Sequence, residues 1–239
     1  MVNAVVTAAR LVALDWGSTR LRAWLLGHGG AILAERQNGD GASVLAGGAP
    51  AFERALAALV GDWLEMGVPV LACGMVGSTH GWREAAYVAC PARLDRLHEH
   101  LVEVNTRAAL HLHIVPGLID ETGATPDVMR GEETQVIGAL ALRPRLAKGR
   151  HVLAHPGTHT KWVAIEDGRM STFQTAFTGE LFALLAGQPN LLPDDWRGRA
   201  GEAIGTARAA TVVTDYVAGM TDRFAQDEYR RLTDISVSG

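Results

Sequence analysis

The segment Leu11-Val-Ala-Leu-Asp-Trp-Gly-Ser-Thr-Arg-Leu-Arg-Ala-Trp-Leu-Leu26 places a glycine and two hydroxyl residues between two apolar runs. Apolar runs on both sides of such a turn predict a β-hairpin with one buried face. Gly17 allows the backbone to approach a ligand closely, and Ser18 and Thr19 add hydroxyl groups. Successive backbone N–H groups in a turn of this kind form an anion-binding concavity. The sequence therefore predicts a phosphate-binding turn.

Asp15 stands at the end of the first apolar run, directly before this turn. A carboxylate there would repel a bare phosphate, so it implies a cation between the two groups. Magnesium held largely through water fits one carboxylate and a phosphate. The alternative is an ordinary hairpin in which an aspartate starts the turn.

A second segment, His151-Val-Leu-Ala-His-Pro-Gly-Thr-His-Thr-Lys-Trp-Val-Ala-Ile165, repeats the arrangement. Gly157 belongs to the turn, Thr158, His159 and Thr160 offer side-chain donors, and Lys161 adds a positive charge. Neither segment has the glycine and Lys-Ser/Thr spacing of a Walker A motif. His159 is also compatible with a surface histidine, and Lys161 with a strand edge. Two such turns in one chain favour a cleft that grips a nucleotide from both sides.

The third segment is Pro126-Asp-Val-Met-Arg-Gly-Glu-Glu-Thr-Gln-Val-Ile-Gly-Ala-Leu140. Its apolar spacing predicts a helix over residues 131–143 that begins with Glu132 and Glu133. Acids in a first helical turn also complement the helix dipole, which is the simpler explanation. The functional interpretation is a general base for phosphoryl transfer. Glu132 is the first candidate, with Glu133 and Asp127 behind it.

In chain order, these segments resemble the 2-dehydro-3-deoxygalactonokinase family of the actin/hexokinase/Hsp70-like superfamily. The matching motifs are residues 13–19, 72–78 with 81–84 and 90–91, 115–118, 126–135, 156–162 and 177–182. The resemblance extends from about residue 11 to residue 186. It implies an α/β fold with two ribonuclease-H-like domains around a cleft. It also implies ATP and Mg²⁺ as cofactors, and phosphorylation of 2-dehydro-3-deoxy-D-galactonate at O6.

The resemblance also directs attention to residues that would line the substrate side of the cleft. The first group follows the apolar strand at 69–73 and comprises Gly74, Met75, Ser78, Trp82, Arg83 and Glu84. Strand ends of this kind open into ligand clefts in α/β folds. Arg83 could pair with a sugar carboxylate or be a solvated surface residue, and Trp82 could stack on the sugar or fill the core. Arg130 belongs to the same set, as do Thr178, Gly179 and Glu180, for which a plain helix cap is the alternative.

The composition agrees with a soluble enzyme that binds small molecules. The chain has 239 residues, 48% of them hydrophobic and 20% charged, with a net charge of −4. This charge gives no case for a nucleic-acid partner. No apolar run reaches the about 18 residues of a membrane span. Met1–Arg10 lacks the charged start of a signal peptide. Two cysteines without metal-ligand spacing, Cys73 and Cys90, suggest reduced thiols in the cytoplasm.

The predicted domains are an N-terminal domain at 1–115, a partial second domain at 116–189 and a divergent helical tail at 190–239. The first contains strands at 11–15, 20–26 and 31–35, a helix at 50–66, a strand at 69–73, a helix at 92–109 and a strand at 112–115. The second contains strands near 151–155, 161–165 and 170–176 and a helix at 181–185. The second domain is expected to be truncated, because the family resemblance stops before its nucleotide-binding wall.

The tail has a resemblance of its own. Residues 210–225 with 228–232 are similar to the closing helix of HD-domain dNTP triphosphohydrolases, and a chance amphipathic helix is the alternative. A single helix at 208–232 is expected, with an apolar stripe of Val212, Val213, Tyr216, Val217, Met220 and Phe224. It would cover the truncated domain or drive homo-oligomerisation. Two alternatives to the kinase remain, a non-catalytic ligand-binding remnant and a hydrolase fragment without its His-Asp metal pair.

Overall fold

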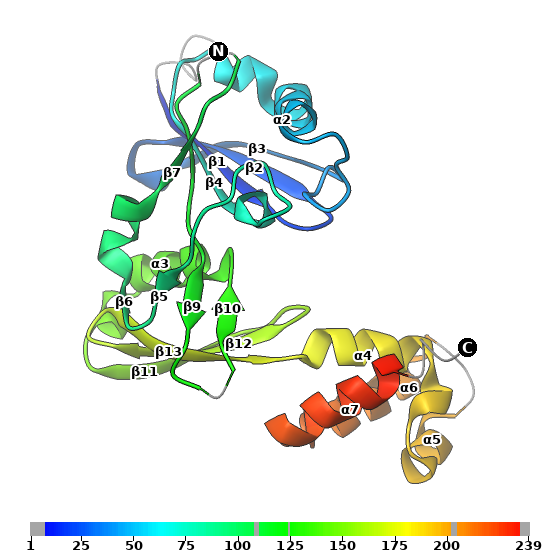
Figure 1. The fold of residues 1–239 in the computed structure, drawn as a ribbon. Coiled ribbons are helices and arrows are strands. Elements are labelled where there is room, and N and C mark those ends of the chain that lie inside the picture. The colour runs from blue at the N-terminus through cyan, green and yellow to red at the C-terminus, as the bar shows by residue number, and fades with distance from the viewer. Residues whose placement is uncertain (1–7, 108–109, 124, 202–204, 235–239) are drawn as a thin grey trace. The chain divides into compact units, whose positions relative to one another are not determined.

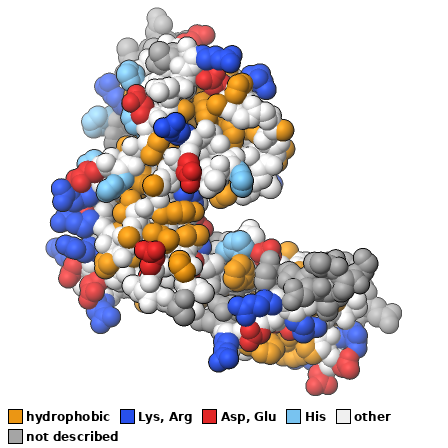
Figure 2. Space-filling model, viewed as in Figure 1, with side chains coloured by type: hydrophobic (Ala, Val, Ile, Leu, Met, Phe, Trp, Pro, Cys, Tyr) orange, Lys and Arg blue, Asp and Glu red, His pale blue; other side chains and the backbone are white. Residues whose placement is uncertain are grey.

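A computed structural model describes residues 8–107, 110–123, 125–201 and 205–234 of the chain (Figure 1). The chain divides into two compact units. Unit 1 comprises residues 1–151 and 165–172, and unit 2 comprises residues 152–164 and 173–239. Charged side chains are spread over the visible surface of both units (Figure 2). None of the described helices is both long and apolar enough to cross a lipid bilayer.

The main sheet of unit 1 is mixed and has the strand order β3-β2-β1-β4-β8-β7. Its strands are β1 (Ala9–Trp16), β2 (Leu21–Gly27), β3 (Ile32–Asn38), β4 (Val70–Gly74), β7 (Val102–Val104) and β8 (Leu112–Ile114). β1, β2 and β3 form an antiparallel meander, whereas β4 runs parallel to β1 and to β8. The meander predicted for residues 11–35 is thus confirmed.

One face of this sheet is covered by the helix α2 (Ala49–Leu64). In β1, Val12, Leu14 and Trp16 are buried, and the ring of Trp16 lies 5.3 Å from that of Phe52 on α2. Because successive strand residues point to opposite faces, Asp15 is directed to the other side of the sheet. This alternation separates the core from the face that carries the candidate site.

The segment after β4 is built from short elements. These are the 3₁₀ helix η2 (Met75–Gly77), β5 (Val88–Ala89), β6 (Ala92–Arg93), the 3₁₀ helix η3 (Leu94–His100), β9 (Leu118–Asp120) and β10 (Asp127–Met129). β10, β9 and β5 form a three-stranded sheet. The helix predicted for residues 92–109 is therefore wrong. Leu94 and Leu97 are buried at the i, i+3 spacing that a 3₁₀ helix aligns, and the valines of β7 favour a strand.

The helix α3 (Glu132–Leu142) follows β10 and is continued by the 3₁₀ helix η4 (Pro144–Ala147). It confirms the predicted helix at 131–143. The strands β11 (Arg150–His155), β12 (Thr160–Glu166) and β13 (Arg169–Ala176) come next, and β13 pairs with β6 through Arg169 and Met170. They confirm the three strands predicted from residue 151 onward.

The described residues of unit 2 form four α-helices that share one hydrophobic core. They are α4 (Thr178–Gly187), α5 (Asp194–Ala200), α6 (Ala207–Ala218) and α7 (Asp222–Asp234), with the 3₁₀ helix η5 (Pro189–Leu191) after α4. Leu181 and Leu185 of α4 are fully buried in this core together with Val213 of α6. The tail therefore packs on α4 within unit 2, whereas the division at 115/116 and 189/190 remains a prediction.

The single helix predicted at 208–232 is broken into α6 and α7. Gly219 ends α6, and the Thr221 hydroxyl accepts the N–H of Phe224 at 3.3 Å, which caps the start of α7. Val212, Val213 and Tyr216 are buried as the stripe predicted. Phe224 is 48% exposed, however, because the break rotates α7 away from a continuous stripe.

Candidate active site

The first predicted phosphate turn lies between β1 and β2. The N–H of Gly17 donates to the carbonyl of Arg20 at 2.9 Å, which closes the turn. The carbonyls of Gly17 and Ser18 accept the N–H groups of Ala42 and Ser43, both at 2.9 Å. Ser18 and Thr19 remain exposed. The turn is thus held from behind by the segment after β3 and presents its hydroxyl residues to solvent.

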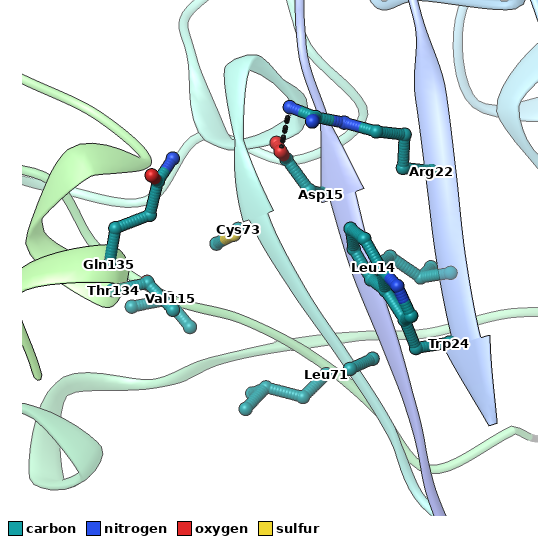
Figure 3. A pocket seen from close by; sticks show the side chains of 10 residues that line it. Leu14, Asp15, Arg22, Trp24, Leu71, Cys73, Val115, Thr134 and Gln135 are labelled. Atoms are coloured by element: carbon teal, nitrogen blue, oxygen red, sulfur yellow. Dashed lines mark hydrogen bonds and ion pairs between the residues drawn. The ribbon is translucent and has the colours of Figure 1, made fainter. Parts of the chain in front are cut away.

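Asp15 and Arg22 lie directly opposite each other in the β1–β2 register. Arg22 Nη2 and Asp15 Oδ2 form an ion pair of 2.5 Å at the mouth of a pocket of about 400 Å³ (Figure 3). The pocket is lined by Ala13, Leu14, Asp15, Arg22, Trp24, Leu71, Cys73, Val115, Thr134 and Gln135. Asp15 therefore lies near the end of β1 and is paired with the guanidinium of Arg22.

The ends of β1 and β4 and the start of α3 meet beside this pocket. Gly74 has φ +94°, and a Cβ there would lie 2.7 Å from the carbonyl oxygen of Trp16. Gly131 has φ +109°, and its Cβ would lie 3.3 Å from the Cα of Gly74. Larger side chains would separate the three segments. These glycines bring the start of α3 next to the end of β4, which in turn lies against the end of β1.

The two carboxylates at the start of α3 have different surroundings. Glu133 is fully buried; its Oε2 accepts the N–H of Gly131 at 2.6 Å and its Oε1 accepts the Thr134 hydroxyl at 3.0 Å. Burial raises the pKa of Glu133 to about 7. Glu132 is only half-buried, and its Oε2 accepts the N–H of Arg130 at 3.1 Å. Glu132 is the carboxylate that a ligand can reach.

The raised pKa of Glu133 predicts a stability that falls with pH. Native Glu133 holds its proton up to about pH 7, whereas the unfolded residue loses it near its ordinary pKa of 4.5. The folded state is therefore favoured at acid pH, and this contribution is lost as the pH rises from about 4.5 through 7. We expect Glu133→Gln to have the wild-type unfolding free energy near pH 4.5 and to exceed it at pH 8, by up to about 3 kcal/mol.

Urea unfolding of both proteins at pH 4.5, 6 and 8 measures this difference. A difference that stays constant with pH would contradict the assignment. The exposed Glu65→Gln is a matched control, for which no such pH-dependent gain is expected.

Cys73 lines the same pocket from β4. Burial raises the pKa of its thiol to about 12, with further contributions from the negative charges of Asp15 and Glu133. The Cys73 thiol is therefore neutral and serves as a small apolar surface of the pocket.

Arg130 packs its guanidinium over the ring of Tyr87, 4.3 Å from the ring centre, and donates from Nη2 to the carbonyl of Ala85 at 2.9 Å. Asp127 pairs with Asp120 across β10 and β9. Neither Asp127 nor Glu132 is among the residues that line the pocket, whereas Thr134 and Gln135 of α3 are. Met75 and Ser78 follow β4 and are half-buried, whereas Arg83 and Glu84 are exposed.

Trp82 is a residue of the hydrophobic core and not a substrate-binding residue as predicted. It is 8% exposed and stands in the core, with its ring 5.9 Å from that of Trp16 and 5.8 Å from that of Phe52. Of the two roles that the sequence allowed for Trp82, filling the core is therefore the one that the structure shows, rather than stacking on the sugar.

The second predicted turn and the start of α4 form one cluster within unit 2. Thr160 and Thr178 hydroxyls lie 2.6 Å apart, and His159 Nε2 lies 2.6 Å from Glu180 Oε2. The N–H of Glu180 donates to the carbonyl of Thr158 at 2.9 Å. A Cβ on Gly179 would lie 2.2 Å from the carbonyl oxygen of Gly157. Thus the predicted phosphate residues 157–160 and the predicted substrate residues 178–180 contact each other directly.

Lys161 continues the same cluster along β12. It is 5% exposed, and its Nζ donates to the Thr175 hydroxyl at 2.6 Å. A buried ammonium of this kind is fixed in place by its partners.

Comparison with known proteins shows which family has this set of motifs. The family model for 2-keto-3-deoxy-galactonokinase matches residues 15–219. The chain belongs to the 2-keto-3-deoxy-galactonokinase family. A relative from Rhizobium meliloti named as a 2-dehydro-3-deoxygalactonokinase is 39% identical over 184 residues, which are 76% of this chain and 58% of the relative. The 2-dehydro-3-deoxygalactonokinase of Escherichia coli is 43% identical over 177 residues, which are 74% of this chain and 56% of that enzyme.

The chain therefore spans less than two thirds of the length of these galactonokinase relatives. Among solved structures, a Sinorhizobium meliloti protein described as a 2-dehydro-3-deoxygalactonokinase has a TM-score of 0.66 and 29% identity, and the match covers 87% of this chain and 78% of that one. This likeness supports the mixed α/β fold.

The C-terminal segment has separate relatives. A deoxyguanosinetriphosphate triphosphohydrolase-like protein of Cereibacter sphaeroides is 50% identical over 58 residues, which are 24% of this chain and 15% of that protein. The resemblance predicted for the tail is confirmed. The described part of the chain contains no group of three or more His, Cys, Asp or Glu residues placed to hold a metal ion.

Sequence reasoning missed several residues that line this pocket, including Arg22, Trp24 and Gln135. Arg22 could have been predicted from the register of the hairpin, because a turn closed by Gly17 and Arg20 places Asp15 opposite Arg22. Sequence reasoning also missed Asp120, which is 4% exposed. Its carboxylate accepts hydrogen bonds from the N–H of Thr122 at 2.9 Å and from the Thr122 hydroxyl at 2.7 Å. It also accepts one from the Thr172 hydroxyl. No local pattern distinguishes this buried structural aspartate from an exposed one.

Proposed function

We propose that the chain catalyses ATP-dependent phosphorylation of 2-dehydro-3-deoxy-D-galactonate at O6. The observation that carries this proposal is the convergence of the Asp15 turn, the end of β4 and the start of α3 on one pocket. This convergence lies inside the segment that the galactonokinase family model matches. The names of the relatives supply the sugar acid and the phosphoryl transfer.

Glu132 is proposed as the general base. A base must lie within hydrogen-bond reach of the proton that it removes. Glu132 is partly exposed, whereas both oxygens of buried Glu133 already accept hydrogen bonds. The Glu132 carboxylate would take the proton of the sugar 6-hydroxyl. The sugar oxygen then bonds to the γ-phosphorus of ATP, the bond from that phosphorus to the bridging oxygen breaks, and ADP leaves.

The remaining residues are assigned to binding. Gly17, Ser18 and Thr19 in unit 1, and the residues from Gly157 to Lys161 in unit 2, are proposed to contact the phosphates of ATP. Gly74, Met75, Ser78, Arg83, Glu84 and Arg130, with Thr178, Gly179 and Glu180, are proposed for the sugar acid. The two-domain actin-like architecture, homo-oligomerisation and a cytoplasmic location belong to the same proposal.

Asp15 could hold magnesium as its single protein ligand. A single carboxylate can hold an Mg²⁺ ion that keeps most of its ligands as water and phosphate oxygens. When bound, the ion would neutralise phosphate charge.

We expect Asp15→Asn to raise the Mg²⁺ concentration for half-maximal activity by about tenfold, equivalent to about 1.4 kcal/mol. A magnesium titration at saturating ATP and sugar acid measures this shift. Glu65→Gln, an exposed acid that has no proposed role in the site, is the control that tests for a general charge effect. An unchanged titration for Asp15→Asn would remove Asp15 from the metal site.

A coupled ADP-release assay against a panel of sugar acids tests the function itself. Turnover that needs 2-dehydro-3-deoxygalactonate supports the proposal. The alternative is a non-catalytic ligand-binding protein. Binding of the sugar acid without ADP release with any member of the panel would support that alternative.

A further inference from the structure

Unit 1 contains a second pocket that includes none of the proposed active-site residues. Its volume is about 350 Å³, and it is lined by Arg93, Leu94, Asp95, Ile137, Leu140, Ala147, Asp167, Gly168 and Arg169. Leu94, Ile137 and Leu140 supply an apolar wall from η3 and from the last two turns of α3. The pocket therefore combines an apolar wall with charged side chains.

Two arginines of this pocket lie directly opposite each other. Arg169 of β13 pairs with Arg93 of β6, and the next pair is Met170 with Ala92. Met170 and Ala92 are buried at 0% and 3% exposure, so the two arginines share the opposite, outer face. Like charges at directly opposite positions of an antiparallel pair destabilise it. Asp95 offsets the charge of Arg93, and a bound anion would offset that of Arg169.

The pocket has two aspartates for its two arginines, but only Asp95 forms an ion pair with one of them. Arg93 donates from Nε and Nη2 to the carboxylate of Asp95 at 3.1 and 2.6 Å. Asp167 accepts the backbone N–H of Gly149 at 2.8 Å. The guanidinium of Arg169 has no ion pair or hydrogen bond with any residue that the structure describes. Arg169 is thus the cation that a ligand can bind.

The segment beside the pocket is also basic. Residues 141–150 contain Arg143, Arg145, Lys148 and Arg150 and no acid, and all four are exposed. Ala147 of this segment lines the pocket, and Arg150 lies 3.6 Å from Glu166. Lys and Arg side chains gather on the left edge of the space-filling view, where the ribbon places β6 and β11 (Figure 2). The local field favours an anion.

We propose that this pocket binds a small organic anion that joins a phosphate or carboxylate group to an apolar portion. Guanidinium groups pair with the planar or tetrahedral oxygens of such anions, and an apolar wall accepts the rest of the molecule. The site would be separate from the sugar-acid and ATP cleft. Binding there does not require that the chain be an active kinase.

Methyl NMR of the full chain with labelled Ile and Leu tests this proposal. Phenyl phosphate and benzoate are the probes, and inorganic phosphate and benzyl alcohol each supply only half of the chemistry. We expect saturable shifts of the Ile137 and Leu140 methyls with at least one probe, and at least tenfold weaker binding of both half-probes. The relative affinities of phenyl phosphate and benzoate distinguish a phosphate ligand from a carboxylate one.

Arg169→Ala should weaken binding by about tenfold, as expected for one lost charge-assisted contact. Arg169→Lys should recover part of it. The control Arg223→Ala removes an exposed arginine of α7 in unit 2 and should bind as the wild type does. Shifts confined to other methyls, equal binding of benzyl alcohol, or wild-type affinity in Arg169→Ala would each overturn the proposal.

Discussion

Glu132→Gln is expected to lower kcat by about 10²–10⁴-fold, the usual contribution of a positioned general base. The amide cannot accept the proton of the sugar hydroxyl, but it keeps the size of the carboxylate and can still accept the N–H of Arg130. Sugar-acid binding should therefore change little. Steady-state kinetics for kcat and calorimetry for the sugar-acid Kd separate the two effects.

Glu133→Gln and Asp127→Asn are the matched controls for this prediction. Glu133 is buried with both oxygens accepting hydrogen bonds, and Asp127 lies on β10 opposite Asp120, so neither change should remove the base. Near wild-type turnover in Glu132→Gln, together with an inactive Asp127→Asn or Glu133→Gln, would show that a different carboxylate is the base.

Val213→Asp is expected to destabilise unit 2 by about 3–5 kcal/mol, because it places an uncompensated charge in a closed core. Val213 is 0% exposed and packs with Leu181 and Leu185 of α4. Loss of this core should loosen α4. The backbone N–H of Glu180, at the start of α4, donates to the carbonyl of Thr158. The turn at residues 157–160 should therefore loosen as well.

Hydrogen exchange followed by mass spectrometry on peptides from residues 156–187 and 207–218 measures both effects. Thr214→Asp is the control, since Thr214 is the exposed neighbour on the same helix and should shift stability by less than about 0.5 kcal/mol. Unchanged protection of the 156–187 peptides in Val213→Asp would mean that the tail does not support α4.

The fold was predictable where local pattern and long-range packing agree. The β1–β2–β3 meander follows from alternating apolar residues and short turns, both of which are local. The segment at 92–109 was not predictable as a helix, because its leucines at positions 94 and 97 fit a 3₁₀ turn as well as an α-helix. The break between α6 and α7 depends on one glycine and one threonine cap, which outweigh the apolar periodicity around them.

The candidate site was predictable to the level of motifs. Asp15, Glu132 and the two turns carry recognisable local chemistry. The sequence could not predict that Glu133 is buried and Glu132 is partly exposed, because two adjacent acids at a helix start look equivalent until their burial is known. The pairing of His159 with Glu180 joins residues 21 positions apart, so it required the contact of the second loop with α4.

The central claim is that this chain transfers the γ-phosphoryl group of ATP to O6 of the sugar acid. Proton-coupled ³¹P NMR of a reaction of the full chain with ATP, Mg²⁺ and 2-dehydro-3-deoxygalactonate tests it most directly. A phosphate on O6 is attached to a CH₂ group, so we predict a new phosphomonoester triplet that grows as ADP appears. The same reaction with Glu132→Gln should give this signal far more slowly. Release of inorganic phosphate alone, or no new phosphorus signal while the sugar acid binds, would contradict the account.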